Sequence, residues 1–307
     1  MENVESFIEE TGGKEPFYTY RNIGKCLSAG ISFITDNITP LLKLFFPIYL
    51  LDGLSMVLMN ANLKSTDIYG LVLLVVGIVL FIANNIMRVG MLSFMLHLDS
   101  INKTFNKYNA WTLIVDSRKH TKRMLLFFLI FLCVCVITFL PVIAVIYFLY
   151  KTGHVNIAYY FVLMYVAMLI FLLLVPSATA MFYAVMENGS TIKNTWTGFK
   201  NGYKYWGKNF GVEIIAGLLV FLITTFLNLP AFVMSEAQLA AQASISTGES
   251  VTLPSIFTPM FLVTTFVTGI LTSLISLLEI SIIAHLYASI KTSEKDSTSI
   301  LKIDELS

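Results

Sequence analysis

The stretch Leu71–Ile82, with the sequence LVLLVVGIVLFI, contains only apolar residues and one glycine. It lies within a longer apolar segment, 68–95, which exceeds the roughly 20 residues that a helix needs to cross a bilayer. Five other segments have comparable length and apolar character. We therefore expect an all-α integral membrane protein with six transmembrane helices. The predicted spans, in chain order, are about 38–59, 68–95, 124–150, 155–185, 212–234 and 259–289.

The overall composition agrees with this fold class. Of the 307 residues, 56% are hydrophobic and 13% are charged, and the mean hydropathy is +0.77. A soluble domain carries about 25% charged residues. The net charge of +1 gives no basic excess for binding nucleic acid, so we expect no such partner.

The chain divides into a membrane domain and two tails. Residues 1–19 form an acidic N-terminal tail, 20–290 form the six-span membrane domain, and 291–307 form a C-terminal tail. The first residues are acidic, whereas a secretory signal peptide begins with basic residues, so we expect none here. The acidic residues in question are Glu2, Glu5, Glu9, Glu10 and Glu15.

Positive charges predict the orientation. Sixteen of the 20 Lys and Arg residues fall in the tails and in two connections between spans, all on one side of the predicted topology. Loops rich in Lys and Arg stay in the cytosol. The sequence therefore predicts a multi-pass protein of the bacterial cytoplasmic membrane with both termini cytosolic and three helical hairpins reaching outward. These sixteen are Lys14, Arg21, Lys25, Lys103, Lys107, Arg118, Lys119, Lys122, Arg123, Lys193, Lys200, Lys204, Lys208, Lys291, Lys295 and Lys302.

A basic amphipathic segment precedes each predicted hairpin. The three segments are Tyr20–Asn37, Asp99–Arg123 and Gly189–Phe210. Such segments favour helices that lie in the headgroup layer on the cytosolic side. The alternative is that they are ordinary loops whose lysines only set the topology. Aligning Asn37 with Asn209 pairs Gly30 with Gly202, which indicates a weak internal repeat.

The third of these segments supplies candidate contacts to lipid headgroups. Helical spacing places Thr195, Phe199, Tyr203 and Trp206 on one predicted face, with lysines around it. Lysines near an anionic membrane surface contribute about 1 kcal/mol each. The candidate headgroup contacts are Lys200, Lys204, Trp206 and Lys208.

Ionisable groups at membrane depth are the candidates for chemistry. Arg88 and Glu279 each lie twenty residues into an inward-running span, about 30 Å deep at 1.5 Å per residue. Glu213 opens the fifth span at the same boundary, and Asn84 and Asn85 lie close to Arg88. We expect these five residues to form a polar cluster. It would hold helices together, or leave Arg88 reaching alone to headgroups, or bind a substrate or proton.

Two further features of the sequence bear on chemistry. Asp52 lies about 21 Å into the first span, where the sequence offers no evident cationic partner. The cysteines (Cys26, Cys133 and Cys135) and the isolated histidines show no disulfide framework and no metal spacing. We find no nucleotide-binding or nucleophile motif either. The sequence therefore predicts no catalytic residue, no metal and no cofactor.

Two stretches carry a family resemblance. They are the segment that opens RNIGKCL at 21–27 and runs to Asn37, and the segment that ends WGKNF at 206–210. With the layout of spans, they resemble uncharacterised bacterial six-span proteins related to the membrane domain of glycerophosphoryl diester phosphodiesterases. That resemblance implies six spans. The hydrolase of the family is a separate soluble domain without a counterpart here, so the resemblance implies no catalytic residue.

Three functional classes remain open from the sequence. The first is a non-enzymatic membrane component that binds membrane lipids or an unidentified membrane protein partner. The second is a small transporter or exporter of an amphipathic solute, which requires a cavity reaching Asp52 or Asn84. The third is an intramembrane enzyme, which requires a clustered catalytic set. The lack of such a set favours the first class.

Overall fold

The structure is a computed structural model that describes residues 16–61, 68–101, 105–152, 156–246 and 253–304. The described residues are almost entirely helical and contain no β-strand. Most of the predicted acidic tail therefore lies outside them. Six helices are long and apolar enough to cross a membrane, which confirms a multi-pass helical membrane protein. They are α3 (Ile38–Ala61), α4 (Ile68–Ser100), α6 (Arg118–Thr152), α7 (Asn156–Met186), α9 (Trp206–Ser246) and α10 (Phe257–Asp304).

Several helices extend beyond the predicted spans. α6 begins at Arg118 and α9 at Trp206, each six residues earlier than expected, and α10 continues through most of the predicted tail 291–307. Helical hydrogen bonds continue through polar residues as easily as through apolar ones. Hydropathy therefore locates the bilayer crossing but not the end of a helix.

A short helix precedes the first long helix of each consecutive pair. These short helices are α2 (Ile23–Asp36), α5 (Ala110–Asp116) and α8 (Thr191–Lys204); a single 3-10 turn, η2 (Phe105–Lys107), precedes α5. One residue separates each short helix from the long helix that follows: Asn37, Ser117 or Tyr205. The Asn37 side chain donates to the carbonyl of Phe33, and the Tyr205 amide donates to that of Asn201. Local hydrogen bonds of this kind close each short helix and let the chain change direction.

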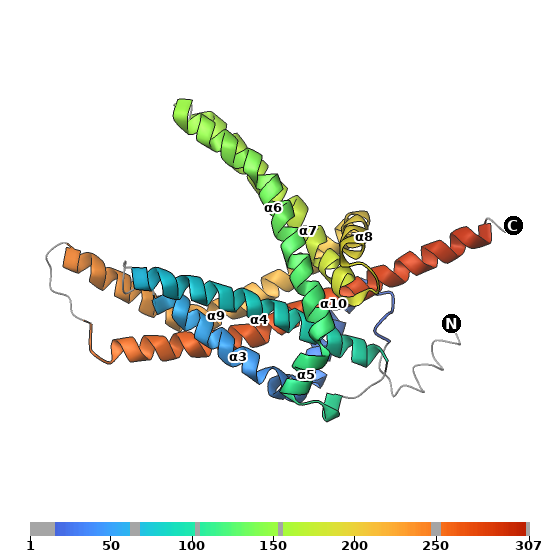
Figure 1. The fold of residues 1–307 in the computed structure, drawn as a ribbon, viewed down its shortest axis with the longest axis horizontal. Helices are drawn as coiled ribbons and strands as arrows, with labels where there is room; N and C mark the ends of the chain where they lie inside the picture. The colour runs from blue at the N-terminus through green and yellow to red at the C-terminus, as the bar shows by residue number, and fades with distance from the viewer. Residues whose placement is uncertain (1–15, 62–67, 102–104, 153–155, 247–252, 305–307) are drawn as a thin grey trace.

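The helices contact one another in a cyclic pattern. Consecutive long helices pair as α3 with α4, α6 with α7 and α9 with α10. Each short helix and the two long helices that follow it form one unit. The first two helices of a unit also contact the last long helix of the preceding unit: α5 and α6 contact α4, and α8 and α9 contact α7. The ring closes where α2 and α3 contact α10. Figure 1 shows that the α6–α7 pair leaves the bundle of α3, α4, α9 and α10 at an angle.

Two glycines bring short helices against their neighbours. A Cβ on Gly30 of α2 would lie 2.6 Å from the Cα of Ile282 on α10. A Cβ on Gly198 of α8 would lie 2.5 Å from the Cα of Ala180 on α7. Both glycines stand seven residues before the break of their unit, and both short helices have 14 residues. Counted from the break, Gly30 corresponds to Gly198, one helical turn away from Gly202, the residue that the sequence alignment pairs with it.

Candidate functional site

The buried ion pair of the membrane domain joins Arg88 to Asp52. The Arg88 guanidinium contacts the Asp52 carboxylate and also donates to the hydroxyl of Ser276. Ser273 donates to the same Asp52 oxygen at 2.5 Å. Arg88 and Asp52 are each 2% exposed. These contacts tie α3, α4 and α10 together at the level of the pair.

This partner differs from the predicted one. We expected Arg88 to meet Glu279 or Glu213, but among the described residues its side chain pairs with Asp52. Side chains on a helix lean toward its N-terminus. The Cα atoms of Asp52 and Arg88 lie at different depths in the membrane. Because α3 and α4 are antiparallel neighbours, the two side chains lean toward each other and bridge this difference in depth. The prediction used backbone depth alone.

The other predicted members of the cluster lie in different surroundings. Asn85 accepts a long hydrogen bond, 3.4 Å, from Arg88, and Asn84 is buried on the same helix. Glu213 on α9 and Glu279 on α10 are close enough to interact electrostatically with each other. The predicted set thus divides into a part around Arg88 and a pair of glutamates.

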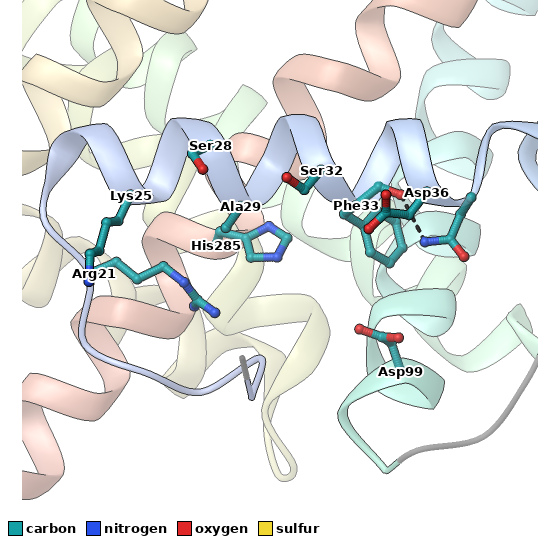
Figure 2. A pocket seen from close by; sticks show the side chains of 10 residues that line it. Arg21, Lys25, Ser28, Ala29, Ser32, Phe33, Asp36, Asp99 and His285 are labelled. Carbon is teal, nitrogen blue, oxygen red and sulfur yellow. Dashed lines mark hydrogen bonds between the residues drawn. The ribbon is translucent and has the colours of Figure 1, made fainter. Parts of the chain in front are cut away.

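A pocket of about 410 Å³ lies along one face of α2. Figure 2 shows Arg21 and Lys25 at one end, and Asp36 and Asp99 at the other. The side chain of His285, from α10, lies between these ends. Ligand pockets in proteins occupy about 300–1,000 Å³, so this volume suits a small polar molecule or a headgroup. The remaining lining residues are Ser28, Ala29, Ser32, Phe33 and Asn37.

Hydrogen bonds to backbone carbonyls fix two side chains in the pocket wall, Arg21 and His285. The Arg21 guanidinium donates to the carbonyls of Phe17 and Pro16, each at 2.8 Å. The Nδ1 of His285 lies 2.8 Å from the carbonyl of Ser281. A carbonyl can only accept, so Nδ1 carries the proton and Nε2 is left as an acceptor. Arg21 is 2% exposed and His285 5%, so both groups have restricted positions.

Sequence reasoning did not find this pocket. The sequence feature that could have indicated the pocket is the polar face of α2, where helical spacing aligns Lys25, Ser28, Ser32 and Asp36. The opposite wall comes from Asp99 and His285, which are distant in the sequence. Only the contact between α2 and α10 brings His285 to the face of α2.

The segment before α2 is fastened to α10. The Ser289 hydroxyl accepts from the Arg21 amide at 2.7 Å and donates to the Arg21 carbonyl at 3.0 Å. Lys208 donates to the same hydroxyl at 2.7 Å and lies over the ring of Tyr20. Lys208, a predicted headgroup contact, is therefore engaged within the protein. Cys26 is fully buried beside this junction, and burial raises the pKa of its thiol.

The exposed face of α8 differs from the predicted face. Thr195 is buried, and Phe199 packs against the core. Trp206 is half-buried and stacks on Tyr203, with ring centroids 5.9 Å apart. The outward residues are instead Ile192, Trp196 and Tyr203, flanked by exposed lysines, Lys193, Lys200 and Lys204. Trp196 is 76% exposed, a large apolar surface for a position beside charged residues.

Comparison with known proteins adds no relative. No protein-family model matches the chain, and neither the curated proteins nor the solved structures contain a significant match. The fold defines the class, a multi-pass α-helical membrane protein. Among the residues that the structure describes, no group of three or more His, Cys, Asp or Glu side chains could hold a metal ion.

Proposed function

We propose that this protein is a non-enzymatic component of a bacterial cytoplasmic membrane that binds lipids of the inner leaflet. In this proposal the long helices form three hairpins, both termini are cytosolic, and α2, α5 and α8 lie in the cytosolic headgroup layer. The support is the position of the short helices. Each stands directly before a membrane-capable helix, on the side where the basic residues gather.

The observation that carries the proposal is the outward face of α8. Ile192, Trp196 and Tyr203 form an exposed apolar stripe beside Lys193, Lys200 and Lys204. Tryptophan and tyrosine are enriched where a membrane meets water, because the rings are apolar with one polar atom. Lysines beside them suit lipid phosphates. α5 also carries an exposed aromatic residue, Trp111, which is 73% exposed.

The buried state of the ion pair favours lipid binding over transport. A transporter of an amphipathic solute would need access from a cavity to Asp52 or Asn84. Both residues are 2% exposed, and neither lines the pocket on α2. Their surroundings are typical of an interface between helices.

The proposal can be tested with one lysine variant and one matched control. The full chain is placed in nanodiscs of mixed anionic and neutral phospholipids, and retained lipids are counted by native mass spectrometry. Lys200→Gln should weaken retention of anionic lipids about fivefold, since one lysine near the surface contributes about 1 kcal/mol. Lys151→Gln makes the same change at the other end of the molecule and should leave retention unchanged. Equal retention in the wild type and both variants would contradict the proposal.

A further inference from the structure

The pocket on α2 has an ordered sequence of charges. Cationic groups, Arg21 and Lys25, line one end, and carboxylates, Asp36 and Asp99, line the other. Hydroxyl groups, including that of Ser32, and the imidazole of His285 lie between them. A site for a simple anion would be cationic throughout. This arrangement complements a ligand with opposite charges at its two ends.

We propose that the pocket binds the headgroup of a long zwitterionic phospholipid, in which a hydroxylated spacer separates the phosphate from a primary ammonium group. The phosphate lies at Arg21 and Lys25, and the ammonium group at Asp36 and Asp99. Aminoacylated phosphoglycerols belong to this chemical class. This inference rests on the proposed function, because it names the lipid that the inner-leaflet site selects.

The separation of the charges in the pocket favours long zwitterions over short ones. Lys25 and Asp36 are eleven residues apart on one helix, so their Cα atoms are separated by roughly 16 Å. The flexible Lys25 side chain spans part of that distance. In phosphatidylethanolamine two carbons separate the phosphate oxygen from the nitrogen, whereas glycerol and an aminoacyl group place several more atoms between the two charges. The longer headgroup therefore suits charged residues at opposite ends of the pocket.

Two side chains of the pocket are already ordered before a ligand binds. Arg21 and His285 are buried and hydrogen-bonded, so they lose little conformational freedom when a ligand enters. With its Nδ1 proton committed to Ser281, His285 offers Nε2 as an acceptor to a hydroxyl of the spacer. The exposed carboxylate of Asp36 then meets the ammonium group at the open end of the pocket.

The lipid arm of the test compares three headgroups: one with a hydroxylated spacer and one ammonium group, one that lacks the ammonium group, and one with a short spacer. Nanodiscs contain equal amounts of alanyl-phosphatidylglycerol, phosphatidylglycerol and phosphatidylethanolamine, and native mass spectrometry measures which lipid the full chain retains. We expect alanyl-phosphatidylglycerol to exceed the other two. Asp36→Asn should lower this preference by up to about fivefold, the upper end for an exposed charge pair. Asp116→Asn, an exposed carboxylate on α5, serves as the matched control.

A second arm separates a lipid ligand from a soluble one. The detergent-solubilised chain is titrated calorimetrically with 6-aminohexyl phosphate and with hexyl phosphate, which lacks the ammonium group. Tighter binding of the amine that depends on Asp36, without a lipid preference, would support the site but assign it to a soluble zwitterion. Equal retention of the three lipids, together with equal binding of the two phosphates, would overturn the inference. Loss of lipid retention in Lys200→Gln would still support the proposed function in that case.

Discussion

Arg88 and Asp52 depend on each other inside the membrane domain. Arg88→Ala removes the cationic partner and leaves a carboxylate buried among helices, which costs roughly 3–5 kcal/mol. We expect a large loss of folded protein, measured as the monodisperse fraction in fluorescence-detected size-exclusion chromatography. Adding Asp52→Asn should restore part of the yield, because the unpaired charge is gone. Adding Glu279→Gln should not, since Asp52 is the carboxylate that pairs with Arg88.

Rescue by Glu279→Gln instead would indicate that Arg88 pairs with Glu279, as backbone depth alone predicts. Equal, additive losses in every combination would show that the two residues act independently. The comparison thus separates a specific pair from a general requirement for polar groups.

Cys26 gives the protein a contribution to stability that depends on pH. Burial raises the pKa of the thiol above its usual 9.0, so the folded state holds the proton more tightly than the unfolded state. The contribution is therefore complete below pH 9 and is lost as the pH rises through the folded-state pKa. We expect thermal unfolding temperatures of the wild type to fall more steeply between pH 8 and pH 11 than those of Cys26→Ala. Parallel curves would contradict this expectation.

At the scale of elements, the crossing of α2 and α10 depends on a missing side chain. Gly30→Ala would place a Cβ 2.6 Å from the Cα of Ile282, and backbone cannot yield as a flexible side chain can. Overpacking of this kind costs about 1–3 kcal/mol. We expect a lower unfolding temperature and a weaker preference for the zwitterionic lipid, because α2 also forms a wall of the pocket.

Gly24→Ala on the same helix is the control. The nearest atom to a new Cβ there is the side-chain oxygen of Asn22, at 3.8 Å, which is ordinary contact. Its unfolding temperature should stay close to that of the wild type. Alanine has a higher helix propensity than glycine, so helix propensity alone predicts no loss at either position. Equal losses in both variants would therefore contradict a specific role for the crossing.

The elements also show what a sequence can predict here. The six apolar helices follow from segment length and hydropathy, because the bilayer imposes both. The break residues and the true ends of α6, α9 and α10 do not, since they depend on local hydrogen bonds within polar stretches. The face of α8 was mispredicted because its buried residues include the small ones, Thr195 and Gly198, which hydropathy undervalues. The pocket required knowledge that α2 lies on α10.

For the whole molecule, the proposed topology makes a direct prediction about accessibility. Asn188 and Ser255 are exposed and lie in connections at opposite ends of the long helices. In a chain whose native cysteines are replaced by serine, Asn188→Cys should react with an impermeant maleimide only after cells are opened. Ser255→Cys should react in intact cells. The reverse pattern would invert the proposed orientation, and labelling of both in intact cells would overturn the six-span topology.

The closure of the ring by α2 on α10 has a consequence for biosynthesis. The ribosome completes α2 long before Ser289, the residue that fastens the Arg21 backbone, has been translated. During elongation the pocket therefore lacks its His285 wall, and its Arg21 end has no anchor on α10. If the pocket binds the proposed headgroup, that binding can begin only after α10 has been synthesised and inserted into the membrane. A nascent chain stalled before α10 should consequently occupy the membrane without acquiring its selectivity.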